Sequence, residues 1–126
     1  MTSLTNGTAY TFTVTATNAV GTSTSSSASN SVIPATTPSA PSAATATSGN
    51  GQATVTWSKP ANGGSTITGY TVTSSPGGQT CSTNDADTLG CVVTNLTNGP
   101  AYTFTGTATN AVGTNTSSSA VNRFTP

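Results

Sequence analysis

Two cysteines are the first side chains in this sequence that could do chemistry. Cys81 and Cys91 stand at the two ends of the segment STNDADTLG, in a chain that has no histidine and no further cysteine. A structural zinc site needs four ligands, and this chain does not supply them. A disulfide is therefore predicted, worth about 2.5 to 3 kcal/mol for a loop of this length, and it implies an oxidising compartment.

The ionisable side chains are too few for acid–base catalysis. Only Lys59, Arg123, Asp85 and Asp87 are charged, and the net charge is zero. A proton carrier that works near neutral pH is most often a histidine. We therefore expect no enzyme activity and no cofactor. Without a basic stripe or an apolar run of about 18 residues, we also expect neither nucleic-acid binding nor membrane insertion.

Two further kinds of chemistry have a weaker basis in the sequence. Asn84, Asp85 and Asp87 could offer oxygens to calcium, but calcium takes about six to eight ligands, so a solvated loop is favoured. Lys59, the only lysine, could form an isopeptide bond with an asparagine. That bond needs a buried carboxylic acid nearby, and neither aspartate falls on a predicted strand.

The elements that must position these side chains are marked by a duplication. Residues 4–34 and 96–126 are identical at 24 of 31 positions, at a spacing of 92 residues. Self-similarity at a fixed period indicates a tandem array. We expect one complete repeat, residues 42–126, preceded by residues 1–34 as the tail end of another repeat, in what is a piece of a longer protein.

Each duplicated stretch predicts a β-hairpin. In the first copy, larger or apolar side chains alternate with threonines from residue 8 to 18, at Tyr10, Phe12, Val14 and Ala16. Alternation with a period of two is typical of a half-buried strand. A turn at residues 18–21 and a Ser/Thr-rich strand to about residue 32 complete the hairpin, and the threonine face is expected to be a polar strand surface.

The proline-rich segment 35–41 separates the two parts and is predicted to be an extended, semi-rigid interdomain linker. Beyond it, short strands are predicted at 43–48, 52–58, 66–75, 79–82 and 88–95, with Ala53, Val55 and Trp57 on one face of the second. With the closing hairpin these make seven strands. The fold class is therefore all-β, an antiparallel immunoglobulin-like sandwich.

These residues resemble the fibronectin type III domain, in the form found as tandem repeats in secreted bacterial proteins. The resemblance rests on the proline-rich start at 38–41, on ATVTWSKP, on ITGYTV and on LTNGPAYTFTGTATNAVG, in which Leu96, Gly99 and Tyr102 are similar to the family's tyrosine corner. It implies strands A, B and E in one sheet, strands G, F, C and C′ in the other, and roles in structural spacing or adhesion. The core is expected to contain Trp57, Tyr70, Val72, Leu96, Tyr102, Phe104 and Ala108.

Gly106 departs from the first copy, which has Val14 at the same position. A buried valine is worth about 1.5 to 3 kcal/mol, so a cavity or a compensating side chain is expected there. We expect Trp57 or the cysteine pair to fill the space.

The function expected from the sequence is structural. A secreted or cell-surface, bacterial repeat would serve as part of a stalk, filament or array, with other copies of itself as partners. A polysaccharide-binding or adhesion module is the alternative, but nearly every aromatic residue is assigned to the core. A lone hairpin is marginal in water, so we expect residues 4–34 to bury Tyr10, Phe12, Val14 and Ala16 against another copy, head to tail or by exchange.

Overall fold

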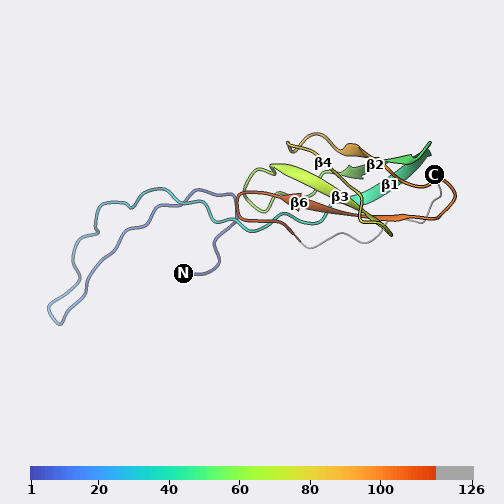
Figure 1. The fold of residues 1–126 in the computed structure, drawn as a ribbon. Helices are drawn as coiled ribbons and strands as arrows, with labels where there is room; N and C mark the ends of the chain where they lie inside the picture. The colour runs from blue at the N-terminus through green and yellow to red at the C-terminus, as the bar shows by residue number, and fades with distance from the viewer. Residues whose placement is uncertain (116–126) are drawn as a thin grey trace.

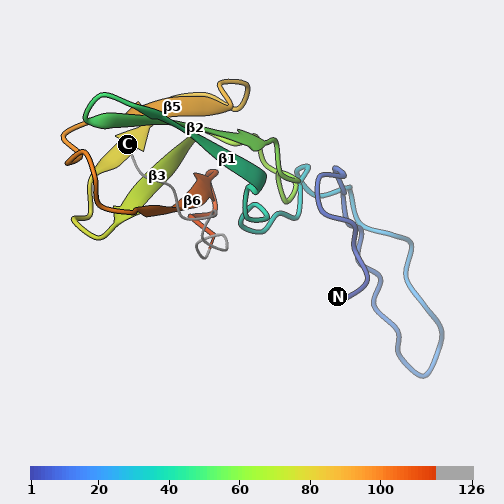
Figure 2. The ribbon, with the colours of Figure 1, turned by 90° about the vertical axis from the view of Figure 1, so that its right-hand side faces the viewer.

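The structure, a computed structural model, describes residues 1–115, with the side chain of Ala43 left aside. It contains six strands: β1 Ser42–Gly49, β2 Gln52–Ser58, β3 Gly69–Ser75, β4 Thr80–Ser82, β5 Gly90–Val93 and β6 Thr103–Thr109. They form two antiparallel sheets, in the orders β1-β2-β5 and β4-β3-β6, which face each other as a sandwich (Figures 1 and 2).

This arrangement confirms the expected fold class, with β1, β2 and β5 in the places of A, B and E, and β3, β4 and β6 in those of C, C′ and F. Two strands are shorter than predicted, because β3 begins only at Gly69 and β5 ends at Val93. Most of the predicted last strand lies outside the described residues. Its first part is visible where Thr114 forms a bridge with Thr109.

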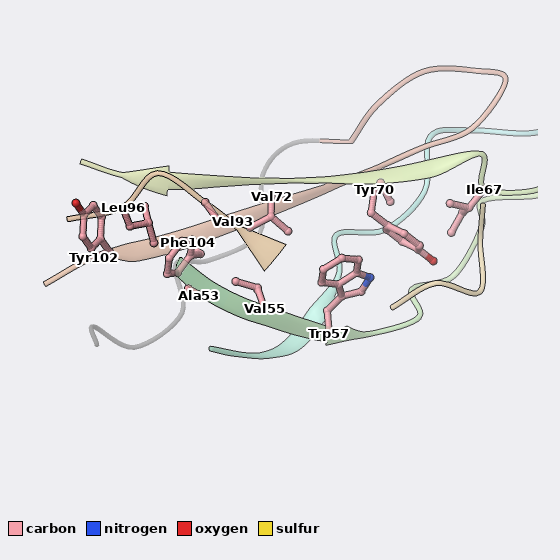
Figure 3. Packing of buried hydrophobic residues seen from close by; sticks show 11 residues of the cluster. Ala53, Val55, Trp57, Ile67, Tyr70, Val72, Val93, Leu96, Tyr102 and Phe104 are labelled. Carbon is pink, nitrogen blue, oxygen red and sulfur yellow. The ribbon is translucent and has the colours of Figure 1, made fainter. Parts of the chain in front are cut away.

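The core lies between the sheets, as Figure 3 shows. Strand β2 alternates strictly, and its three buried residues, Ala53, Val55 and Trp57, all point inward. The Trp57 and Tyr70 rings pack with their centroids 5.3 Å apart. The buried hydrophobic residues are Ala53, Val55, Trp57, Ile67, Tyr70, Val72, Val93, Leu96, Tyr102, Phe104 and Ala108. All seven residues expected in the core are among them.

Residues 1–34 run out from one end of the sandwich as a long hairpin (Figures 1 and 2). The pairing differs from the regular ladder that the alternation predicts. Only two bridges form, Tyr10 with Val32 and Thr17 with Thr22. Between the bridges the returning strand uses three residues for every two of the outgoing strand, so a regular ladder cannot be kept.

Serine hydroxyls replace the missing ladder. Three backbone amides donate to serine hydroxyls at a distance of 2.9 Å: Ala16 to Ser23 Oγ, Val14 to Ser26 Oγ and Phe12 to Ser29 Oγ. The amides of the same serines donate back to the carbonyls of Ala16, Val14 and Phe12, at 2.7, 2.9 and 2.8 Å. Each extra residue of the returning strand is thus accommodated as a bulge, which also increases the twist of the hairpin.

Segment 35–41, predicted to be a linker, connects the hairpin to β1 and packs against the sandwich. Pro38 and Pro41 are buried. The amides of Thr36 and Ser39 donate to the carbonyls of Gly63 and Ala61, at 2.9 and 3.0 Å. The segment therefore packs on the loop before β3 as part of the sandwich, a long-range contact that local composition does not reveal.

Candidate functional site

The charged side chains that the structure describes, those of Lys59, Asp85 and Asp87, lie at the surface. Lys59 Nζ forms an ion pair with Asp87 Oδ1 over 2.9 Å, and both side chains are exposed. The hydrogen bond from Lys59 to Asp87 and the charge of that carboxylate raise the pKa of Lys59. Isopeptide chemistry requires a buried acid beside the lysine, and an exposed ion pair does not provide one.

The loop between β4 and β5 is organised by Asp85. Its Oδ1 accepts hydrogen bonds from the amides of Asp87 and Thr88, at 3.0 and 2.7 Å, and its Oδ2 accepts one from the Thr88 hydroxyl. These bonds, the Thr88 amide first, lower the pKa of Asp85. Both carboxylate oxygens therefore serve the turn itself. Among residues 1–115 no cluster of three or more acidic, cysteine or histidine side chains could hold a metal ion.

Cys81 and Cys91 are joined in a disulfide, with their α-carbons 6.1 Å apart. Cys81 lies on β4 and Cys91 on β5, which belong to different sheets. The bond therefore ties the two sheets together along one edge. Both cysteines also pack against the core.

The most highly organised contact outside the core is the joint between the hairpin and the sandwich. We use "joint" for residues 6–7 and 34–37, the loop 61–64 and Asn110. Asn110 is only 4% exposed and lies at its centre. Its Nδ2 donates to the carbonyls of Thr36 and Asn62, each over 2.8 Å, and its Oδ1 accepts from the amides of Val112 and Gly113. One side chain thus connects the incoming chain, the 61–64 loop and its own turn.

Two glycines in this loop are required by the closeness of the backbone. A Cβ at Gly63 would lie 2.5 Å from the Thr36 carbonyl oxygen and 2.6 Å from that of Thr37. A Cβ at Gly64 would lie 2.6 Å from the Gly7 amide nitrogen and 2.8 Å from the Pro34 oxygen. Both residues also have a positive φ, of 74° and 100°. The sequence marked this loop only as a turn, and the repeated glycine was the one available signal of a close approach.

The corner and the turn of the hairpin make the same hydrogen bonds as their counterparts in the sandwich. Tyr10 Oη accepts from the Thr5 amide, and Tyr102 Oη accepts from the Thr97 amide, both at 3.0 Å. The turn amides bind Asn18 Oδ1 as they bind Asn110 Oδ1. Asn115 Oδ1 accepts from the Ala108 amide, as Ser23 Oγ does from Ala16. As far as residue 115, the two copies therefore share these corner and turn contacts.

The hairpin's apolar face is only partly covered within the chain. Tyr10 and Phe12 are half-buried, Ala16 is exposed and Val14 is 70% exposed. Their counterparts Tyr102, Phe104 and Ala108 are buried against β1–β5, while Gly106 takes the place of Val14. The strand that carries the residues predicted for an assembly surface is thus partly exposed in the single chain, and the assembly itself stays a prediction.

A small groove, part of it open to solvent, passes over Gly106. Among the described residues, Pro41, Ala44, Trp57 and Tyr70 contribute to its lining. Trp57 therefore borders the space without filling it, and neither cysteine lines it, which corrects our expectation.

The sandwich order, the tyrosine corner and the buried Trp57 on the second strand together indicate one family. The sequence model of the fibronectin type III domain matches residues 37–124. The chain belongs to the fibronectin type III family. No curated protein matches the sequence. Among residues 1–115 there is no helix long and apolar enough to cross a membrane.

Solved structures share this fibronectin type III fold at low sequence identity. A crystal structure of domains from titin superposes with a TM-score of 0.63 and 24% identity, over 76% of this chain and 35% of that chain. The twitchin kinase region from C. elegans matches with a TM-score of 0.60 and 20% identity, over 71% and 17%. The chain thus spans about a third or less of these two structures.

A match to the chicken CNTN1 FN1–FN3 domains extends further along the chain. It has a TM-score of 0.60 and 17% identity and covers 98% of this chain and 44% of that one. The superposition therefore includes the hairpin as well as the sandwich.

Proposed function

We propose that this chain is a non-catalytic structural repeat of a tandem fibronectin type III array. Sandwiches would follow one another head to tail and give reach to a stalk, filament or surface array of a secreted or cell-surface bacterial protein. The observation that carries the proposal is the joint. There Gly7 and Pro34 of the hairpin lie in close contact with Gly64, and the adjoining Thr36 is hydrogen-bonded to Gly63 and Asn110 of the sandwich.

The disulfide supports the extracellular part of the proposal. Disulfides form and persist in oxidising environments and are rare in the cytosol. Cys81 and Cys91 are bonded across the two sheets. Hydroxyl side chains supply most of the polar surface, since only four residues of the chain are charged.

In such an array, the apolar face of the hairpin must be covered by a surface from another copy. Tyr10 and Phe12 correspond to Tyr102 and Phe104, which are buried against β1–β5 of this repeat. A neighbouring copy in a head-to-tail polymer would cover the hairpin with another part of its surface. If hairpins exchange, the β1–β5 surface of a second copy would receive it. In an exchange, Val14 would bring a side chain to the groove that Gly106 leaves open.

Light scattering coupled to size-exclusion chromatography tests the assembly. The full chain is expected to run as a concentration-dependent oligomer, and a chain without residues 1–34 as a folded monomer. Circular dichroism of the shortened chain checks that its sandwich is intact. A full chain that remains monomeric at all concentrations would contradict assembly through residues 4–34.

An adhesion or polysaccharide-binding role has less support. Sugar-binding surfaces usually present aromatic rings, and four of the six aromatic residues described, Trp57, Tyr70, Tyr102 and Phe104, are buried in the core. The other two lie on the hairpin face assigned to assembly. A polysaccharide pull-down with micromolar binding by the full chain would favour this second role.

A further inference from the structure

The corner at Asn98–Gly99 repeats the corner at Asn6–Gly7, but only the first copy has a neighbour. Gly7 sits on the 61–64 loop, and a Cβ on Gly7 would lie 3.4 Å from the Gly64 Cα. A Cβ on Gly99 would meet no described atom within 4 Å. Both glycines have a positive φ, 84° and 105°, so the two corners also have similar backbones.

The Asn98 corner is held more firmly than its counterpart. Asn98 Oδ1 accepts from the Gly51 amide, and Asn98 Nδ2 donates to Asn50 Oδ1, both at 2.8 Å. Leu96 beside it is buried, and its amide donates to the Gly51 carbonyl. Gly99 is therefore presented by a corner that the sandwich has already fixed in place, so docking there orders little additional backbone.

We propose that the Asn98–Gly99 corner is a docking site for the 61–64 loop of a following copy of this repeat, and that it forms the same joint that Asn6–Gly7 forms with Gly64. The occupant is argued from the chain itself, because an almost identical corner already holds this loop. The proposal rests on the tandem-array function above and specifies how consecutive repeats touch. Its consequence is a fixed orientation between neighbouring sandwiches.

Such a joint brings the backbones of Gly64 in the 61–64 loop and Gly99 in the corner close together, so neither residue can carry a large side chain. At Gly64 even a methyl group would come within 3.0 Å of two backbone atoms of the preceding hairpin. At Gly99 a methyl group would make ordinary contact, by analogy with the 3.4 Å at Gly7, whereas a leucine would push the loop away. In the single chain the same Gly99→Leu change meets open space. Its backbone strain at a φ of 105° is matched by Gly99→Ala, whose methyl group is too short to push the loop away.

The test uses a two-copy chain, residues 1–126 followed directly by residues 35–126, so that Pro126 precedes Ala35 as Pro34 does. Residual dipolar couplings are measured for both sandwiches in a weakly aligning medium. We expect the two sandwiches to share one alignment tensor. Gly99→Leu in the first copy should abolish the shared tensor, while Gly99→Leu in the single chain should leave the sandwich folded and the hairpin joint unchanged.

A second variant acts from the other side of the joint and does not touch Gly99. Gly64→Ala in the second copy should uncouple the sandwiches, while Gly77→Ala in the same copy should not. Gly77 has a similar φ of 93°, and a Cβ there would meet nothing within 4 Å, so the backbone strain is matched.

Independent tensors in the unmodified two-copy chain would overturn the docking proposal, and so would a shared tensor that survives Gly99→Leu. Neither result would remove the structural function, because a flexible array also provides reach. A monomeric full chain would contradict assembly through the hairpin and leave this test of the joint unaffected.

Discussion

Trp57 combines extensive packing with an unpaired donor. Its side chain is 7% exposed and packs on Tyr70, yet its buried Nε1 has no hydrogen-bond partner among the described residues. An unsatisfied buried donor costs about 1 to 3 kcal/mol, whereas the indole's apolar surface stabilises the core. These two contributions can be separated by substitution.

Trp57→Ala should lower the free energy of unfolding by about 3 to 5 kcal/mol, because a large cavity is left between the sheets. Trp57→Phe should cost less than about 1.5 kcal/mol, since it keeps most of the ring packing and removes the unpaired donor. Urea unfolding followed by circular dichroism measures both changes. A loss well above about 1.5 kcal/mol for Trp57→Phe would show that Nε1 is paired and that its hydrogen bond matters.

Asp85 makes stability depend on pH at the acidic end. Its pKa in the folded chain is below the ordinary value of 3.8, first because the Thr88 amide donates to the carboxylate. The contribution is therefore fully present above the ordinary pKa and is lost as the pH falls through the lowered folded value. The melting temperature should fall in acid more steeply for the parent than for Asp85→Asn. Parallel melting curves from neutral to strongly acidic pH would contradict this role.

At the scale of elements, the spacing of apolar residues predicted the strands whose buried face alternates regularly along the chain. The alternation of Ala53, Val55 and Trp57 gave β2 its bounds and its buried face. The irregular pairing of the hairpin could not be predicted, because the returning strand has serines at 23, 25, 26, 27, 29 and 31, and this composition does not reveal which of them pair. The docking of segment 35–41 depends on residues far along the chain, and no local pattern contains that information.

The joint and the hairpin offer a matched pair of asparagines. Asn110→Ala removes two bonds to the carbonyls of Thr36 and Asn62 from a buried position, and should destabilise the sandwich by about 2 to 3 kcal/mol. Asn18→Ala removes the same turn bonds in an exposed position and should change sandwich stability by less than about 0.5 kcal/mol. Chemical denaturation compares the two, and similar losses would mean that the turn, not the joint, is stabilising.

The disulfide ties the edge strands β4 and β5. Reduction, or Cys81→Ser together with Cys91→Ser, should lower stability by about 2.5 to 3 kcal/mol while the sandwich remains folded. Thermal unfolding with and without reductant measures the loss, and the far-ultraviolet spectrum checks the fold. A mass that corresponds to two free thiols in the untreated protein would contradict the bond itself.

At the scale of the whole molecule, the one ion pair among residues 1–115, Lys59 with Asp87, is exposed. Exposed pairs contribute about 0 to 1 kcal/mol and are screened by salt. The melting temperature of the full chain should therefore change little between low and high sodium chloride. A large salt-dependent shift would indicate that charged contacts contribute more than the described structure allows.

The bond between Cys81 and Cys91 also sets how far each repeat could lengthen under tension. A pulling force applied to the two ends of the chain can straighten every segment except the one enclosed by the bond. The two cysteines are 10 residues apart in sequence, and an extended chain spans about 3.4 Å per residue, so each oxidised repeat would yield about 30 Å less extension than a reduced one. The redox state of the surroundings would thereby fix the maximum stretch of an array without altering its resting length.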